Sequence, residues 1–154
     1  MSNLLIKNAN ELVTCSGKIA KYGKEMSDIH VIEGGAVVVE NGIIKDLGKT
    51  DDILSKYNEK DYEVIDATGK AVLPGFVDSH THFVFGGYRA DEFSWRLRGD
   101  SYMDIMNRGG GIVSSVTATR EASEEELIKR GLERLDSMLA FGVTSVCLLY
   151  TSDA

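Results

Sequence analysis

The sequence has 154 residues, of which 43% are hydrophobic and 27% charged, so its composition is that of a globular domain and not of a disordered chain. Its formal net charge is −7, and no cluster of Lys and Arg could neutralise successive phosphates, which argues against a nucleic-acid partner. No apolar run approaches the roughly 18 residues of a membrane span, and the N-terminus lacks the basic and apolar regions of a leader peptide. These features predict a cytoplasmic protein without a membrane partner.

The first 70 residues are expected to form a small β domain, because short β-prone runs alternate with turn signals. The predicted strands are residues 4–7, 11–15, 28–32, 36–40, 43–47 and 63–66. Asn41-Gly42 lies between two of them and can adopt the two positive φ values of a type I′ turn, which predicts a hairpin. One or two helical turns are expected within residues 51–57, and a turn within residues 67–70.

A new structural unit is expected to begin near residue 70. Pro74 is the only proline in the chain and cannot donate to a β ladder, so Pro74-Gly75 predicts a corner between the β domain and a new strand. We therefore expect one domain over residues 1–70 and a second from residue 71 onward.

A helix and a second strand are predicted further along the chain. Ser123 and Glu126 form a capping-box pattern at the start of a run with helical apolar spacing, and Gly142 is typical of a helix end. The apolar residues 143–149 that follow indicate a buried strand. Strand, helix and strand in this order predict a parallel α/β fold.

The two cysteines, Cys15 and Cys147, are too few and too far apart in sequence to indicate a disulfide framework or a paired-thiol metal site. A catalytic thiol would need a histidine partner, and the histidines have better explanations. Each cysteine is therefore predicted to be a small buried apolar residue.

The clearest chemical motif is His80-Thr81-His82, which comes at the end of a predicted strand. Side chains two residues apart in a strand lie on one face, so the two imidazoles can bind one metal ion together. The pair alone leaves a second interpretation open, in which both histidines are hydrogen-bonded polar residues near a sheet edge. Its position after the first strand beyond a β domain favours the metal site, since active sites of (β/α)8 barrels lie at such strand ends.

Three segments around this motif carry a family resemblance. The run of residues 73–82, Leu-Pro-Gly-Phe-Val-Asp-Ser-His-Thr-His, resembles the signature of metal-dependent amidohydrolases. Residues 83–93 and 109–120 resemble the imidazolonepropionase family within that superfamily. The resemblance implies an α/β protein in which residues 1–70 belong to a β-sandwich and residues 71–146 begin an incomplete (β/α)8 TIM barrel.

The resemblance also implies functional residues. His80 and His82 would bind one zinc or iron ion, with a histidine and an aspartate from later strands completing the ligands. Arg89 would bind the propionate carboxylate of the substrate, 4-imidazolone-5-propanoate, because a guanidinium can hold a carboxylate in two places. The reaction would be metal-dependent hydrolysis of a cyclic amide C–N bond to N-formimidoyl-L-glutamate, a step of histidine degradation. No residue of the chain is assigned as the catalytic acid or base, and Asp78 is expected to have a structural role or to support a metal ligand.

Two other interpretations remain open. Another cyclic amidohydrolase, or an aminohydrolase acting on a purine or triazine ring, would share the two histidines, although Arg89 and the Gly-Gly-Gly-Ile segment argue against it. A non-catalytic truncated product is the alternative from a different class. Without the resemblance, Arg89 would be interpreted as an exposed arginine beside Asp91 and Glu92. A homodimer is compatible with the resemblance for the full-length parent.

The three glycines at residues 109–111 could be mistaken for a phosphate-binding loop. They lack the required Gly-Lys-Ser/Thr ending and do not lead from a strand into a helix in the required way. We predict instead a flexible loop that lets the backbone turn tightly near the mouth of the site.

The chain departs from the family after Thr144. The family continues with an acidic residue and a Lys-Ser-Gly-Tyr-Gly segment whose tyrosine contacts substrate, whereas residues 147–154 read Cys-Leu-Leu-Tyr-Thr-Ser-Asp-Ala. Tyr150 does not fall at the matching position, so that role is not transferred to it. Residues 147–154 are predicted to be non-native. The fragment alone is predicted to be inactive, since a (β/α)8 barrel needs about 250 residues.

Overall fold

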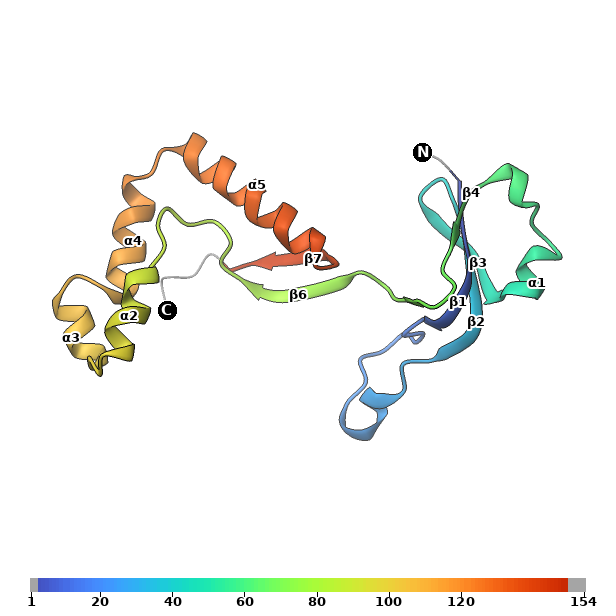
Figure 1. Cartoon of the computed structure of the whole chain (residues 1–154), viewed down its shortest axis with the longest axis horizontal. Helices are drawn as coiled ribbons and strands as arrows, with labels where there is room; N and C mark the ends of the chain where they lie inside the picture. The colour runs from blue at the N-terminus through green and yellow to red at the C-terminus, as the bar shows by residue number, and fades with distance from the viewer. Residues whose placement is uncertain (1–2, 150–154) are drawn as a thin grey trace. The chain divides into compact units, whose positions relative to one another are not determined.

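The computed structural model describes residues 3–149, which belong to two compact units (Figure 1). The first unit ends at Pro74 and the second begins at Gly75. This division falls at the predicted Pro74-Gly75 corner, a few residues beyond the domain boundary expected near residue 70. The assignment of the two units to domains of a larger protein stays a prediction.

Unit 1 is built on one mixed β-sheet. Its strands are β1 (Leu4–Val13), β2 (Val31–Glu40), β3 (Ile43–Lys49), β4 (Glu63–Asp66) and β5 (Ala71–Val72). The order across the sheet is β3-β2-β1-β4, and β5 also pairs with β1. β1 runs antiparallel to β2 but parallel to β4 and β5. The short helical segments of this unit are η1 (Gly23–Ser27), α1 (Thr50–Leu54) and η2 (Glu59–Asp61).

The local turn signals of unit 1 are confirmed. Asn41 has φ 53° and Gly42 has φ 81°, which are the left-handed conformations of a type I′ turn, and β2 pairs with β3 through it. The predicted turn at residues 67–70 is closed by a hydrogen bond from the Lys70 N–H to the Ala67 carbonyl at 2.9 Å. In both places the residue types dictate the backbone conformation, so the sequence is sufficient to predict it.

β1 is one strand, whereas two were predicted. The pairing of β1 with β2 shifts register between Ile6 and Ala9, where Asn8 has φ 59°, so a bulge interrupts the strand in place of a turn. The Asn8 N–H donates to the Thr50 hydroxyl at 3.0 Å. A side chain thus replaces the ladder partner that the bulge removes, which lets the strand continue.

Both faces of the sheet carry buried apolar side chains. Successive residues of a strand point to opposite faces, and Val37 and Val38 accordingly belong to different clusters. The clusters consist of Leu5, Ala36, Val38 and Ile53 on one side and of Ala9, Leu12, Val37 and Ala67 on the other. Burial of each large aliphatic side chain stabilises the fold by roughly 1.5–3 kcal/mol. Residues 3–74 contain a single sheet, so the second sheet of a β-sandwich stays a prediction.

Asp66, the last residue of β4, organises the turn that follows. Its Oδ1 accepts hydrogen bonds from the Thr68 hydroxyl at 2.6 Å, the Thr68 N–H at 2.9 Å and the Asn8 side-chain amide at 3.3 Å. The Thr68 hydroxyl has the largest effect among the contacts that hold the pKa of Asp66 below its usual value of 3.8.

Asp66→Asn is expected to destabilise the protein more at about pH 7 than at about pH 2. A carboxyl group whose pKa is lower in the folded than in the unfolded chain stabilises the fold above its unfolded pKa. This contribution disappears as the pH falls through the folded pKa, so wild type and variant should converge in acid. Thermal unfolding at both pH values measures the difference. Asp61→Asn, at an exposed position of the same unit, is the control, and equal pH dependence in the two variants would contradict the assignment.

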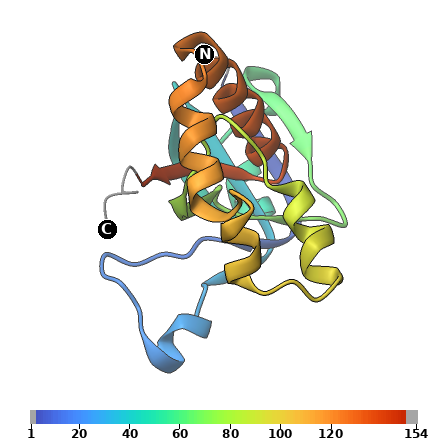
Figure 2. The ribbon, with the colours of Figure 1, turned by 90° about the vertical axis from the view of Figure 1, so that its left-hand side faces the viewer.

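Within residues 75–149, unit 2 contains a parallel pair of strands and four helices, drawn in Figures 1 and 2. The strands are β6 (Phe76–Thr81) and β7 (Val143–Leu148), and the helices are α2 (Ala90–Leu97), α3 (Tyr102–Asn107), α4 (Gly111–Glu121) and α5 (Glu124–Ala140). β6 and β7 are parallel, as the predicted order of strand, helix and strand requires. None of the helices between residues 3 and 149 has the length and apolar composition of a membrane-spanning helix.

α5 begins and ends at the predicted signals. The Ser123 hydroxyl accepts the Glu126 N–H at 3.2 Å, and the Glu126 carboxylate accepts the Ser123 N–H at 3.4 Å, which completes a capping box. Gly142 follows the helix with φ 86°, the left-handed conformation that ends many helices. Both ends are therefore fixed by local chemistry.

Helices α2, α3 and α4 lie in a region where the sequence patterns predict no helix. α2 has no buried residue and α3 has only Ile105, so few side chains of these two helices pack into a core. A signal for α3 is nevertheless present: the Ser101 hydroxyl accepts the Asp104 N–H at 3.2 Å in a second capping box. Serine followed three residues later by an acid indicates this helix start in the sequence.

The prediction that both cysteines are buried is wrong, because Cys15 and Cys147 are both exposed. Cys15 follows β1 and has φ 48°, so it belongs to an irregular connection and not to the core. Cys147 lies on β7, which pairs with β6 alone within the described residues. α5 contacts β7, and Val146 and Leu148 are half-buried while Cys147 between them is exposed, so an apolar residue type does not ensure burial on a strand that is covered only in part.

The chain end predicted to be non-native is described only in part. β7 extends through Cys147 and Leu148, and the Leu149 N–H donates to the Thr81 carbonyl at 3.0 Å. Residues 150–154, with Tyr150, lie outside the described residues. The non-native origin of residues 147–154 stays a prediction.

Candidate metal centre

His80 and His82 lie together at the end of β6. Their ring centroids are 5.4 Å apart with the ring planes at 69°, and both side chains are exposed. Thr81 between them is buried, and its hydroxyl donates to the Cys147 carbonyl of β7 at 2.9 Å. The alternation of side chains along an extended chain thus turns Thr81 toward the neighbouring strand and leaves the two imidazoles side by side.

The histidines come at the carboxyl end of a parallel strand pair. Thr81, the last residue of β6, pairs with Leu148, the last residue of β7. Loops at this end of parallel strands form the active sites of (β/α)8 barrels. The geometry therefore places the imidazoles at the edge of the sheet where such folds carry out chemistry.

Asp78 supports the backbone beside this pair. Its Oδ1 accepts the His80 N–H at 3.2 Å, and its residue pairs with Val146 of β7. This contact agrees with a structural role for Asp78, since the carboxylate is engaged by the backbone next to the first imidazole.

The donor set fits part of a transition-metal site. Imidazole nitrogens suit zinc and iron, and within residues 3–149 neither imidazole has a hydrogen-bond partner that would occupy its ring nitrogens. The alternative of two hydrogen-bonded structural histidines gains no support from these contacts. Residues 3–149 contain no group of three or more His, Cys, Asp or Glu side chains placed to hold a metal ion, so the pair would supply only part of a ligand set.

Arg89 immediately precedes α2 and faces an acidic neighbour. Its Nη1 lies 3.7 Å from Glu92 Oε2, and its side chain is 42% exposed. The other carboxylate oxygen of Glu92 accepts the Gly111 N–H at 2.6 Å. Within the described residues, no hydrogen bond or ion pair joins Arg89 to His80 or His82. The structure brings the two histidines together and leaves Arg89 in a separate ion pair.

The triple glycine turns tightly, as predicted, and its last residue begins a helix. Gly109 has φ 82° and Gly111 has φ 68°, and Gly111 is the first residue of α4. A Cβ on Gly110 would lie 2.7 Å from Ile105 and 2.9 Å from the Glu92 carboxylate. The segment is therefore closely packed between α3 and α4, with Glu92 as the side chain that fixes it.

Sequence reasoning missed two arginines on α5 that contact the loop between His82 and Arg89. Arg134 donates to the carbonyls of Phe83 and Phe85, and Arg130 donates to the carbonyl of Gly86. The sequence signal is their spacing of four residues, which places both on one face of a helix. That spacing does not reveal which loop they contact.

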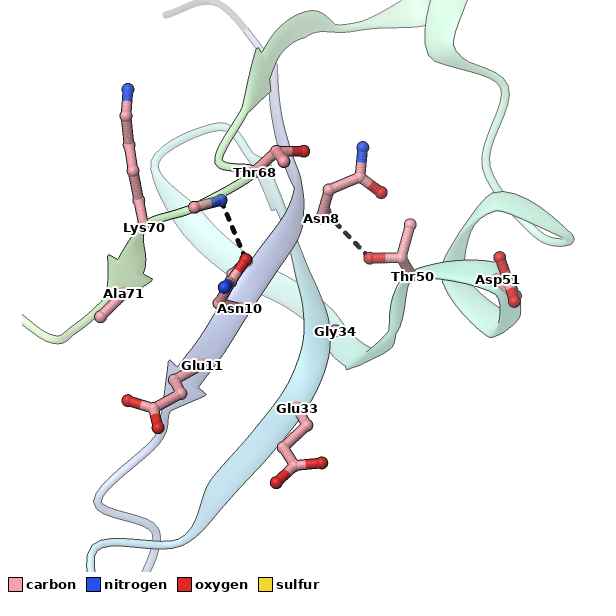
Figure 3. A pocket seen from close by; sticks show the side chains of 12 residues that line it. Asn8, Asn10, Glu11, Glu33, Gly34, Thr50, Asp51, Thr68, Lys70 and Ala71 are labelled. Carbon is pink, nitrogen blue, oxygen red and sulfur yellow. Dashed lines mark hydrogen bonds between the residues drawn. The ribbon is translucent and has the colours of Figure 1, made fainter.

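A polar hollow of about 860 Å³ lies elsewhere, in unit 1, around the bulge of β1 (Figure 3). Two hydrogen bonds across it hold the bulge and a neighbouring turn, from Asn8 N–H to the Thr50 hydroxyl and from Gly69 N–H to the Asn10 side chain. Its lining has no histidine or cysteine. Among the described residues it holds no group of three or more side chains placed to bind a metal ion, and the histidine pair remains the candidate site.

Comparisons with known proteins indicate the family that this chain resembles. A profile of the amidohydrolase family matches residues 63–114, a segment that contains the two histidines and Arg89. Members of that family generally bind a metal ion. A protein of Clostridium tetani named imidazolonepropionase is 66% identical over 144 residues, and one of Parabacteroides distasonis with the same name is 57% identical over 145 residues. Each alignment covers 94% of this chain.

The chain spans about a third of the length of the curated relatives it matches, 34% for the C. tetani protein and 35% for the P. distasonis protein. Among solved structures, a triazine hydrolase from Arthobacter aurescens superposes with a TM-score of 0.65 at 18% identity, over 95% of this chain and 28% of that one. Guanine deaminase of E. coli gives a TM-score of 0.65 at 18% identity, over 94% of this chain and 30% of that one. At these identities the likeness concerns the fold alone.

Proposed function

This chain belongs to the imidazolonepropionase family of amidohydrolases, and on that premise we propose that the complete protein hydrolyses 4-imidazolone-5-propanoate to N-formimidoyl-L-glutamate. One observation carries the proposal: an exposed imidazole pair stands at the carboxyl end of a parallel strand, in a chain 66% identical to a protein of that name. The reaction is the hydrolysis of a cyclic amide C–N bond within histidine degradation.

His80 and His82 would hold one metal ion, zinc or iron, together with ligands from the part of the protein outside this chain. When bound, the metal supplies a Lewis acid for the ring carbonyl and makes a bound water acidic enough to ionise near neutral pH. The contribution of this chain is to keep the two imidazoles side by side. The hydrogen bond from Thr81 to β7 and the Asp78 contact to the His80 N–H fix the backbone on which they stand.

Arg89 would bind the propionate carboxylate of the substrate. Its distance of 3.7 Å from Glu92 Oε2 exceeds the 2.7–2.9 Å of a strong charge-assisted hydrogen bond, so the guanidinium keeps donors for a second carboxylate. Glu92 is in turn engaged by the Gly111 N–H, which limits how far it can follow Arg89. Arg89 would thereby orient the ring so that its carbonyl faces the histidines.

The fold of the complete protein is part of the proposal. Unit 1 would join a β-sandwich, and β6, α5 and β7 would be the first members of a (β/α)8 barrel, a fold of about 250 residues. The TM-scores of 0.65 to two amidohydrolase-type enzymes support this architecture. The cytoplasmic location and the homodimer stay predictions.

The rival function is another amidohydrolase that acts on a purine or triazine ring. Its support is structural likeness at 18% identity, which does not extend to substrate. A neutral ring has no carboxylate for Arg89 to bind, so a substrate panel separates the two proposals. Hydrolysis of 4-imidazolone-5-propanoate without turnover of guanine or chlorotriazine supports the first. The reverse result would replace it with the second, and no turnover of any ring would favour a non-catalytic protein.

Arg89→Ala in the complete protein is expected to raise KM about 100-fold with kcat changed by less than about fivefold, because a charge-assisted contact to a carboxylate is worth about 1.5–3 kcal/mol. Arg89→Lys should recover part of the affinity, since an ammonium keeps the charge but not the fork. Steady-state kinetics measure both. The control is Arg96→Ala, which removes an exposed arginine from the helix that follows Arg89, and an unchanged KM in Arg89→Ala would exclude the carboxylate contact.

A further inference from the structure

The segment of residues 83–88 connects the metal-site histidines to the predicted substrate arginine. It runs from His82 to Arg89 and forms neither helix nor strand. Backbone groups in such a segment need partners other than a regular ladder. The side chains that supply them therefore determine where its two ends lie.

Arg134 of α5 provides the largest share of these partners. Its Nη1 donates to the Phe83 carbonyl at 2.8 Å and to the Phe85 carbonyl at 3.1 Å, and its Nε donates to the Tyr88 hydroxyl at 3.0 Å. Phe83 is the residue next to His82, and Tyr88 is the residue next to Arg89. One guanidinium thus contacts both ends of the segment.

Two aromatic rings pack against the Arg134 guanidinium. Its Cζ lies 3.5 Å from the centroid of the Phe85 ring and 4.9 Å from that of Tyr88, and the two rings meet edge to face at 5.1 Å and 85°. Its Nη2 is buried without a hydrogen-bond partner in the described structure. Burying part of a charged group is costly, and the ring faces offset that cost through cation–π attraction. The Arg134 guanidinium therefore packs against the two aromatic rings and is not a free surface charge.

Neighbouring residues hold the middle of the segment. Arg130, one turn earlier on α5, donates to the Gly86 carbonyl, and the Gly86 N–H donates to the Thr119 hydroxyl of α4 at 3.0 Å. Gly86 is buried, and a Cβ at this position would clash with the backbone of Ala118. Three carbonyls and one amide of the segment are thus bound by side chains of two helices.

We propose that Arg134 is a positioning residue that sets the separation of His82 and Arg89 and thereby aligns a carboxylate-bearing substrate with the metal. The substrate in this proposal rests on the proposed function. The contacts of Arg134 with the segment do not depend on it. A planar fork is required, because one group must reach two carbonyls and a hydroxyl while its face stacks on Phe85. The seventeen-residue helix α5 gives this fork a rigid support.

The test uses Arg134→Ala and Arg134→Lys in the complete protein, with Lys129→Ala as the control on an exposed position of the same helix. The first reading is the affinity of the metal-free protein for Zn²⁺, measured by chelator competition. We expect Arg134→Ala to weaken it about tenfold, as for other residues that orient metal ligands, and Lys129→Ala to leave it unchanged. The Zn²⁺ affinity is measured without substrate, so this result tests the role of Arg134 even if the proposed reaction is wrong.

The second reading is a double-mutant cycle on KM with Arg89→Ala. Arg134→Ala is expected to raise KM about tenfold in the wild-type background but less than about twofold when Arg89 is already absent, because residues that act through one another are not additive. Equal factors in the two backgrounds, or a Zn²⁺ affinity within twofold of wild type, would overturn the proposal. If Arg134→Ala does not fold, Arg134→Lys gives the same two readings. It keeps a charge but not the fork, and wild-type values for it would equally overturn the proposal.

Discussion

His80→Ala in the complete protein is expected to remove most of the bound metal and to lower kcat/KM by at least about a thousandfold. A catalytic metal with a lost ligand neither stays bound nor polarises the ring carbonyl, and that stabilisation is worth several kcal/mol. The ring centroids of His80 and His82 are 5.4 Å apart, and the alanine variant leaves only one of the two imidazoles that this chain would supply to the metal. Metal content by elemental analysis and steady-state kinetics on 4-imidazolone-5-propanoate measure the two effects.

His30→Ala is the matched control for this variant. His30 lies in unit 1 with a half-exposed side chain, and its Nε2 is 3.3 Å from an Asp28 carboxylate oxygen. Its loss removes an imidazole without touching the candidate centre, so metal content and activity should remain at wild-type values. Full activity with normal metal content in His80→Ala would reject the metal assignment and the proposed function with it.

Gly86→Ala is expected to destabilise the complete protein by about 3 kcal/mol or to prevent its accumulation as folded protein. A Cβ at residue 86 would lie 2.1 Å from the Ala118 carbonyl oxygen and 2.9 Å from the Thr119 Cα, and both are helix backbone atoms that a side-chain rotation cannot move. The segment or α4 must therefore shift. Urea unfolding measures the loss, and expression as soluble protein provides a second reading.

Gly131→Ala is the control for the same residue change in the same unit. Gly131 is inside α5, where a Cβ would meet Val84 at 3.6 Å, an ordinary van der Waals contact. Alanine in a helix interior is preferred over glycine by about 1 kcal/mol, so this variant should be slightly more stable than wild type. A Gly86→Ala protein as stable as wild type would contradict the close packing of residues 83–88.

Local signals in the sequence predict a large part of the fold. The Asn41-Gly42 turn and the capping box of Ser123 depend on residue type and spacing alone, so they are visible without the structure. The same holds for His80 and His82, because strand periodicity places both rings on one side. Where chemistry is set by neighbours in the chain, the sequence is sufficient.

Features that depend on distant residues escape such reasoning. The bulge at Asn8 is stabilised by Thr50, a residue 42 positions away, and without that partner the pattern resembles two strands. The role of Arg134 is invisible because its targets are backbone carbonyls 49 and 51 positions earlier. The exposure of Cys147 depends on which layers cover β7. Each case requires the tertiary arrangement before the residue can be interpreted.

The long separation between the loop and its arginine has a consequence for synthesis on the ribosome. Phe83 and Arg134 are 51 residues apart, so at about 5–20 residues per second roughly 3–10 s pass between the translation of the two. During this interval the histidine-bearing strand also lacks β7, its parallel partner. The carbonyls of Phe83 and Phe85 then lack the guanidinium that binds them in the folded chain, and the unfinished segment is open to nonspecific association. Completion of α5 therefore supplies the two arginines that bind the loop, before β7 is available to pair with β6.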